Sequence, residues 1–267
     1  MINKLFSRQN RALLSELVRT DFKLRYQGSA IGYMWSLLRP LFMFAILYVV
    51  FNYVFKLGDT IPNYPIYLFM GIVLWTFFTE MTQQSLGAIV GRGDLIRKIR
   101  IPRWMIIVST SLSALINLGL NMIIVFILAL ISGMDFMKSS VFLPIFIIEI
   151  YVFALGLSLI LSALFVKYRD VSFIWEVLLQ AGFYITPILY PLTLITNTKI
   201  QKILLINPLA QAIQGARNVF VTKETITISD IFHSPYAFLI PVFISLVFLL
   251  AGILYFKKEA PHFAENL

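Results

Sequence analysis

The segment from residue 93 to residue 103, with the sequence GDLIRKIRIPR, combines residue types that suit docking to another protein. Asp94 can cap the start of a short helix, and Pro102 cannot continue one. Leu95 and Ile99 are four residues apart, so they share one face of that helix. The remaining positions are mostly basic: Ile96, Arg97, Lys98 and Arg100. The pattern predicts a docking helix. An ordinary basic cytoplasmic loop, the alternative, would need only the charges.

The common catalytic motifs are missing from the sequence. It has no phosphate-binding G-x-x-x-x-G-K-[ST] loop, no G-x-S-x-G and no H-E-x-x-H. It has no cysteine, and its two histidines, His233 and His262, are 29 residues apart. We therefore expect no catalytic residue, no metal site and no cofactor in this chain. Energy for any transport would come from a partner or from an ion gradient.

Three glutamates fall inside apolar stretches, where ionised side chains are costly. Glu80 and Glu176 lie within about two helical turns of predicted helix ends, from which they can reach water. Glu149 lies nearer the middle of its stretch. A proton-coupled transporter would need such an acid, so gradient-driven transport is one interpretation of Glu149. A hydrogen bond to a neighbouring helix is the other.

Aromatic residues form a stripe at helical spacing. Phe44, Tyr48, Phe51 and Phe55 follow one another at intervals of three or four residues. A later apolar stretch adds Phe183, Tyr184 and Tyr190. Aromatic rings can lie against the apolar faces of sugars, so these seven residues are candidates for lining a substrate channel. Packing against lipid or other helices is the alternative, because 15% of the chain is aromatic.

The composition requires these residues to be carried by membrane-spanning helices. Of the 267 residues, 59% are hydrophobic and 13% are charged, and the mean hydropathy is +0.85. A soluble surface would need more polar residues. The apolar stretches are continuous rather than alternating, which excludes a β-barrel. The sequence therefore predicts an all-α, polytopic membrane protein.

Six apolar stretches are long enough to cross a bilayer, which takes roughly 20 residues. We place these spans at residues 32–55, 67–88, 104–132, 141–166, 172–190 and 236–256. Residues 1–31 read as an amphipathic helix in the membrane interface, because Leu13, Leu17 and their apolar neighbours recur at helical spacing among charges. Residues 191–235 contain apolar pieces too short to cross, which predicts short re-entrant helices. Residues 257–267 form a polar tail, so all 267 residues make a single membrane domain.

The positive charges predict the orientation. The chain has 22 Lys and Arg against 13 Asp and Glu. Segments 1–39, 91–103, 167–170 and 257–267 contain 16 of the 22, and cytoplasmic loops are the ones enriched in Lys and Arg. Both termini are therefore predicted to be cytoplasmic. The same rule accounts for the net charge of +9 without a nucleic-acid partner.

Five motifs in the expected order resemble one family. They are the basic segment around Asp94, the stretch from Arg25 to Trp35 (RYQGSAIGYMW) with Pro40, Arg169-Asp170-Val171, Pro187-Ile188-Leu189-Tyr190-Pro191, and Asn207-Pro208-Leu209. Together they resemble the permease subunits of second-class ABC exporters, which move O-antigen, capsule and teichoic acid chains. The resemblance runs from about residue 13 to 258. Ile31 replaces the usual leucine, a swap that conserves volume.

The resemblance implies a homodimer of this chain with two copies of a separate ATPase, which would hold the ATP and Mg. The ATPase would dock at the coupling helix within residues 91–103 and at the turn after span four. The docking candidates are Asp94, Leu95, Ile96, Arg97, Lys98, Ile99, Arg100, Arg169 and Asp170. The substrate would be a lipid-linked polysaccharide or polyol-phosphate polymer crossing a bacterial inner membrane. Exporters of drugs or small lipids, and gradient-driven lipid flippases, are the alternatives.

The interfacial helix would then gate the cytoplasmic entrance. Its basic residues could meet anionic lipids and the pyrophosphate linker of such a substrate. The entrance candidates are Arg19, Lys23, Arg25, Tyr26 and Trp35, with Arg8 and Arg11 also on the helix. Binding of the same residues to inner-leaflet lipids alone is the other interpretation.

Overall fold

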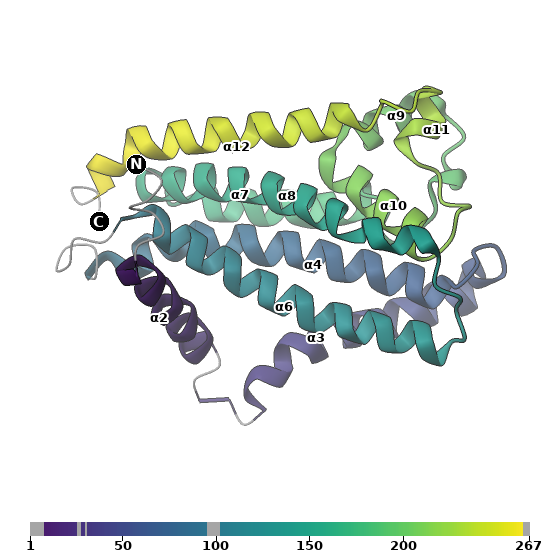
Figure 1. Ribbon diagram of the computed structural model, residues 1–267, viewed down its shortest axis with the longest axis horizontal. Helices are drawn as coiled ribbons and strands as arrows, with labels where there is room; N and C mark the ends of the chain where they lie inside the picture. The colour runs from purple at the N-terminus through teal and green to yellow at the C-terminus, as the bar shows by residue number, and fades with distance from the viewer. Residues whose placement is uncertain (1–7, 26–27, 30, 95–101, 264–267) are drawn as a thin grey trace.

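The computed structural model describes residues 8–25, 28–29, 31–94 and 102–263. These residues form helices and connecting turns without a β-strand, so the predicted all-α class is confirmed for them. The long helices make an elongated bundle (Figure 1). The start of α2 (Arg8–Arg25) and the last turn of α12 (Leu239–Glu259) lie at the same end of it.

Five segments are long and apolar enough to cross a membrane: Gly32–Val54, Tyr64–Ala88, Trp104–Ile131, Lys138–Lys167 and Leu239–His262. The first contains α3 (Trp35–Tyr48) and ends in a π-helical turn, Val49–Val54. The next three contain α4 (Tyr64–Ala88), α6 (Trp104–Ile131) and α7 (Leu143–Lys167). Each lies within a few residues of a predicted span, because an uninterrupted apolar run determines where the helix can sit.

The predicted fifth span is shorter than expected. It corresponds to α8 (Val171–Ile185), whose 15 residues extend about 22 Å, whereas the hydrocarbon core is about 30 Å thick. The helix ends at Ile185 because Pro187, two residues later, cannot donate the next backbone hydrogen bond. The described residues therefore contain five helices of spanning length, and a sixth crossing stays a prediction.

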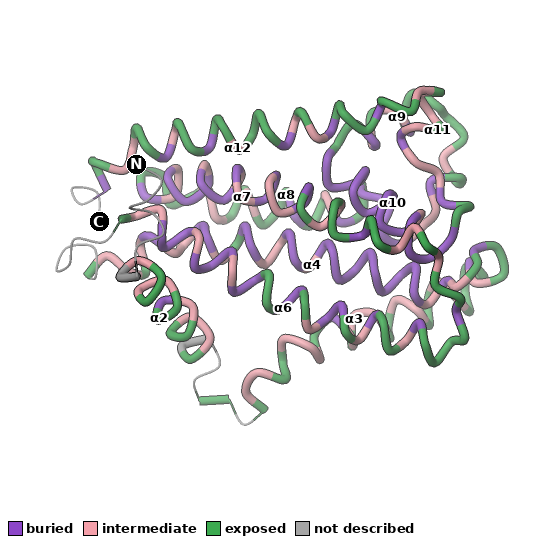
Figure 2. The backbone as a smooth tube through the Cα atoms, viewed as in Figure 1, coloured by how far each residue is buried: buried purple, intermediate pink, exposed green. Residues whose placement is uncertain are grey.

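Helix α4 is the centre of the bundle. It contacts α3, α6, α7, α8 and α10 (Pro208–Phe220), and most of its length is buried (Figure 2). Ile66, Leu68, Phe69 and Met70 are fully buried. In contrast, little of the first spanning segment is buried, and its residues are exposed or half-buried. Helix α3 therefore has an uncovered apolar face beside the buried α4, and α8 has one as well.

Helices α7 and α12 touch through their backbones. A Cβ placed on Gly156 of α7 would lie 2.5 Å from the carbonyl carbon of Phe248 on α12. A Cβ on Gly252 of α12 would lie 2.4 Å from the carbonyl oxygen of Gly156. Only glycine permits this approach, as in other close pairs of membrane helices.

The segment after α8 contains three short helices. These are α9 (Thr198–Ile206), α10 and α11 (Ile228–Phe232). Asn207 begins α10 by accepting a hydrogen bond from the backbone N–H of Leu209 at 3.0 Å. Helix α10 is buried along nearly all its length against α4 and α7. Whether it enters the bilayer stays a prediction.

Candidate functional site: a polar groove between α3, α4 and α8

A cavity of about 590 Å³ opens between the start of α3, the second half of α4, and α8. Its walls combine apolar side chains with many polar and charged ones, although they lie largely within segments long and apolar enough to cross a membrane. The lining residues include Trp35, Ser36, Arg39, Trp75, Thr76, Thr79, Glu80, Gln83, Gln84, Glu176, Gln180, Phe183 and Tyr184. Polar side chains inside a membrane usually face a water-filled path, so this groove is the first candidate for a substrate route.

The polar wall on α4 follows helical periodicity. Thr76, Thr79, Glu80, Gln83 and Gln84 recur at spacings of three and four residues, so they occupy one face. Sequence reasoning identified only Glu80 among them. The signal was nevertheless present, because a polar stripe in an otherwise apolar span indicates a face that avoids lipid.

A hydrogen-bond network holds Glu80 in this wall. The Nε2 of Gln84 donates to Glu80 Oε1 at 2.9 Å, and Asn117 Nδ2 of α6 donates to the same oxygen. Tyr33, just before α3, donates its hydroxyl to Asn117 Oδ1 at 2.6 Å. Asn117 is 1% exposed, which makes these bonds costly to lose. The network fixes the start of α3 against both α4 and α6.

The predicted aromatic residues do not all lie in one place. Trp35, Phe183 and Tyr184 line the groove. Phe44 packs against Phe69 of α4, with ring centroids 5.0 Å apart, and contributes to the bundle core. The structure therefore brings the α8 aromatics to the groove and turns part of the α3 stripe toward α4.

The other α3 aromatics lie toward the far end of the helix. Tyr48 stacks on Tyr64 with centroids 6.4 Å apart, and Phe51 stacks on Phe55 at 5.1 Å. Tyr48 also lines a second, open cavity of about 370 Å³, whose polar residues are Asn52, Asp59, Thr60, Asn63 and Glu224. The two cavities therefore flank the same helix, one near its start and one near its end.

Tyr190 lies in the turn after α8. Its hydroxyl donates to backbone carbonyls at the end of that helix, at 3.0 Å to Ile185 and 3.2 Å to Tyr184. These bonds satisfy carbonyls left without an intrahelical partner where the helix stops. The observed contacts of Tyr190 are therefore with the helix end.

Of the docking candidates, the structure describes Asp94, Arg169 and Asp170, which lie in the loops at the end of the bundle that holds the start of α2. Leu95, Ile96, Arg97, Lys98, Ile99 and Arg100 lie outside the described residues. Asp94 is exposed after α4, and Arg169 and Asp170 are exposed in the turn between α7 and α8. The guanidinium of Arg169 lies 5.2 Å from the ring centroid of Phe165. The described candidates in both loops are therefore accessible.

The entrance candidates lie around α2, which packs against α6 at an angle to the other long helices (Figure 1). Arg19 and Lys23 are exposed on α2, and Leu17 is buried. Tyr26 and the side chain of Arg25 lie outside the described residues. Of the five candidates, Trp35 reaches the groove itself.

In the described part of the chain, no group of three or more His, Cys, Asp or Glu side chains is arranged to hold a metal ion. The groove contains two carboxylates, Glu80 and Glu176, beside the cation Arg39. Its chemistry is that of a hydrogen-bonding, mixed-charge passage.

The long apolar helices define a multi-pass membrane protein, and a cavity with polar side chains lies beside its central helix. The chain belongs to the ABC-2 type transporter family, whose profile matches residues 12–221. It is 30% identical over 260 residues to the O-antigen export system permease protein RfbA of Myxococcus xanthus, covering 97% of this chain and 96% of that protein. An RfbA of Klebsiella pneumoniae is 29% identical over 256 residues, covering 96% and 95%. The polysialic acid transport protein KpsM of Escherichia coli is 23% identical over 203 residues, covering 74% and 76%.

Proposed function

We propose that this chain is the membrane-spanning subunit of an ATP-driven exporter that moves a lipid-linked polysaccharide or polyol-phosphate polymer across a bacterial inner membrane. The observation that carries the proposal is the polar groove between α3, α4 and α8. The similarity to O-antigen and polysialic acid transport proteins supports the same substrate class.

The side chains of the groove suit a carbohydrate. Amides, hydroxyls and carboxylates can exchange hydrogen bonds with sugar hydroxyls as the polymer advances. Trp35 and Tyr184 can stack on the apolar faces of the rings. No single contact of this kind is strong, so a chain could slide past. An exporter of small lipids or drugs would be better served by a pocket with fewer polar and charged side chains.

Two copies of the chain would close the groove. The opening lies beside α3 and α8, whose outward faces are apolar and exposed: Phe42, Ile46, Phe173, Ile174 and Val177. Lipid could cover these faces, but the lipid chains would then also lie against the polar side chains of the groove, which is unfavourable. A two-fold homodimer would instead surround the polymer with two polar walls.

Six crossings with both termini in the cytoplasm fit this arrangement. Helix α8 would make the fifth crossing together with the turn through Pro187 and Pro191 and the buried helix α10. Irregular backbone is tolerated at membrane depth where protein covers it, and Thr186, Ile188 and Leu189 are buried. The loops with most Lys and Arg would then face the cytoplasm.

Blocking the groove should stop export. Gln180 of α8 lines the groove, so Gln180→Trp is expected to reduce polymer export at least about tenfold, since misplacing a substrate by an ångström or more can cost that much. Leu254 is exposed on α12, which does not line the groove. Leu254→Trp is therefore the control and should export normally. Cell-surface polymer would be quantified at equal permease levels, and equal export by both variants would contradict the groove assignment.

The separate ATPase would dock on the cytoplasmic loops. The double change Leu95→Asp with Ile99→Asp should abolish co-purification of the ATPase and export, because burying two unpaired carboxylates in an apolar contact is costly. The swap Leu95→Ile with Ile99→Leu keeps the apolar face and should preserve both. Co-purification from membranes measures docking directly. An intact complex in the double aspartate variant would show that docking lies elsewhere.

The basic face of α2 would meet the substrate's anionic linker or anionic lipids at the cytoplasmic entrance.

A gradient-driven flippase is the competing function. It is favoured by Glu149, which is 7% exposed on α7 with an Oε1 that has no hydrogen-bond partner in the described residues. Export that follows the proton gradient rather than ATP supply would select that alternative.

A further inference from the structure

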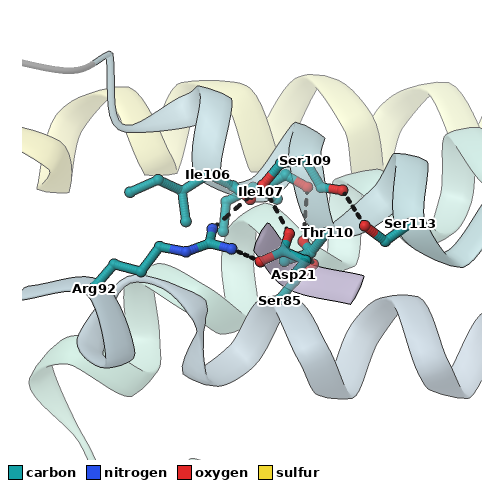
Figure 3. Close-up of polar contacts among 8 residues, drawn as sticks. All are labelled: Asp21, Ser85, Arg92, Ile106, Ile107, Ser109, Thr110 and Ser113. Atoms are coloured by element: carbon teal, nitrogen blue, oxygen red, sulfur yellow. Dashed lines mark hydrogen bonds and ion pairs between the residues drawn. The ribbon is translucent and has the colours of Figure 1, made fainter. Parts of the chain in front are cut away.

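Three polar residues connect α2 to the chain on both sides of residues 93–103, the predicted cytoplasmic loop between α4 and α6 (Figure 3). Asp21 of α2 forms an ion pair with Arg92, which lies just after α4. Arg92 also donates to Ser109 Oγ of α6 at 3.3 Å, and this hydroxyl lies 3.2 Å from Asp21 Oδ2. The serine proton can go either to Asp21 or to the carbonyl oxygen of Ile106, 2.8 Å away. The cluster therefore joins the chain before residue 93, the chain after residue 103, and α2.

The cluster is sheltered from solvent. The side chains of Arg92 and Asp21 are 16% and 15% exposed, and Ser109 is fully buried. Burial lowers the pKa of Arg92, because its charged form loses solvation. Removing one member of such a pair leaves the other charge poorly solvated, whereas an exposed pair contributes little. Breaking the pair would therefore be costly, which favours α2 and Arg92 keeping their contact when either of them moves.

Contacts continue from the cluster to the groove. Phe22, next to Asp21, meets the ring of Tyr33 edge to face with centroids 5.4 Å apart. Tyr33 donates to Asn117, which donates to Glu80 in the groove wall. Each step is a ring contact or a hydrogen bond between different elements. A displacement of α2 would therefore change the positions of Trp35, which follows Tyr33 by two residues, and of Glu80, both of which line the groove.

We infer that Asp21 and Arg92 are a positioning pair that makes α2 follow the cytoplasmic loop, so that movement of the loop opens or closes the entrance to the groove. The inference rests on the proposed function, because that function supplies the ATPase that would move the loop. The ATPase can shift the equilibrium between an open and a closed entrance only if it interacts differently with the two states. The ion pair would keep the loop and α2 together in each of these states. A pair that only stabilised the fold would leave the amount of polymer exported per ATP unchanged when it is broken.

The link itself can be measured without any partner. The chain has no native cysteine, so spin labels can be placed at Ala12→Cys on α2 and Gly91→Cys beside Arg92, both exposed. Pulsed electron resonance on the dimer in lipid discs should give a narrow distance distribution for the unaltered pair. Asp21→Asn should broaden it, and the charge swap Asp21→Arg with Arg92→Asp should narrow it again. An unchanged distribution in Asp21→Asn overturns the inference.

The consequence for transport uses the complete exporter. Asp21→Asn should keep the ATPase bound and its hydrolysis within about twofold of the unaltered rate, while polymer exported per ATP falls about tenfold, a common size of coupling between sites. The charge swap should recover most of this ratio. Glu16→Gln removes an exposed carboxylate from the same helix and should have no effect.

The outcomes separate the two hypotheses. If Asp21→Asn exports like Glu16→Gln, or if the effects of Asp21→Asn and Arg92→Gln simply add, the positioning pair is wrong. If the unaltered complex shows no ATP-dependent export, the proposed function fails, whereas the spin-label result still decides whether the link exists.

Discussion

Replacing Arg217 with methionine is expected to destabilise the protein by about 3–5 kcal/mol. Arg217 of α10 is fully buried, and its guanidinium donates to the carbonyls of Tyr67 at 3.0 Å and of Pro187 and Ile188 at 2.6 Å each. It also lies 3.7 Å from the Tyr67 ring centroid. Methionine fills a similar volume but has no N–H group, so it would leave these buried carbonyls without their donor.

Lysine should rescue Arg217 only in part. Its three donors radiate from one nitrogen and cannot reproduce the planar fork that spans Tyr67 and the Pro187–Ile188 turn. We therefore expect Arg217→Lys to cost about half as much as Arg217→Met, and Lys199→Met on an exposed position to cost nothing measurable. Thermal unfolding in detergent measures all three variants: each is heated, and the fraction that stays monodisperse is recorded. Equal stability of Arg217→Met and Lys199→Met would contradict this role.

The second large effect is expected at the contact between α7 and α12. Gly156→Ala would place a methyl 2.5 Å from the carbonyl carbon and 2.6 Å from the carbonyl oxygen of Phe248. These are backbone atoms, so the clash can be relieved only by separating the helices. The expected loss is about 2–3 kcal/mol for alanine and more for leucine.

Gly119 provides a matched control for Gly156. It lies in α6, and a Cβ added to it would meet no atom within 4 Å. Gly119→Ala should be neutral or stabilise the helix by up to about 1 kcal/mol, since alanine has the better helix propensity. The same detergent unfolding assay compares the pair. A Gly156→Ala protein as stable as Gly119→Ala would mean that α7 and α12 are not held this closely.

The bounds of the long helices could be predicted because lipid imposes a simple requirement. The 28 residues of α6 contain no charge, so residues 104–131 could hardly form anything but a membrane helix. Helix α8 was less predictable. Its apolar pattern continues to Tyr190, and only backbone geometry decides that Pro187 ends the helix rather than kinking it.

The groove was only partly predictable. Phe183 and Tyr184 were candidates and do line it, but Glu80 was the only residue of the polar α4 face that the sequence brought to attention. Periodicity shows that Thr76, Thr79 and Gln83 share a face, yet it does not show which helices leave that face uncovered. That depends on how α3 and α8 pack, which is a tertiary property.

The role of Arg217 left no signal in the sequence. By sequence it is one more positive charge in an outer segment, where most cations remain in water. Gln214 Oε1, three residues away, accepts one of its hydrogen bonds, but its other three acceptors are backbone carbonyls 29, 30 and 150 residues away, and every residue type carries such a carbonyl. Side-chain patterns cannot report contacts of this kind.

The close contact between α7 and α12 has a mechanical consequence. Two helices whose backbones touch at Gly156 and Gly252 cannot slide or rotate past each other without clashes, so we expect them to move as one rigid body. Helix α3, largely uncovered and followed by a π-helical turn, has no such restraint over most of its length. The groove is lined by α3 and not by α7 or α12, so its width would change with the position of α3 while that pair stays rigid.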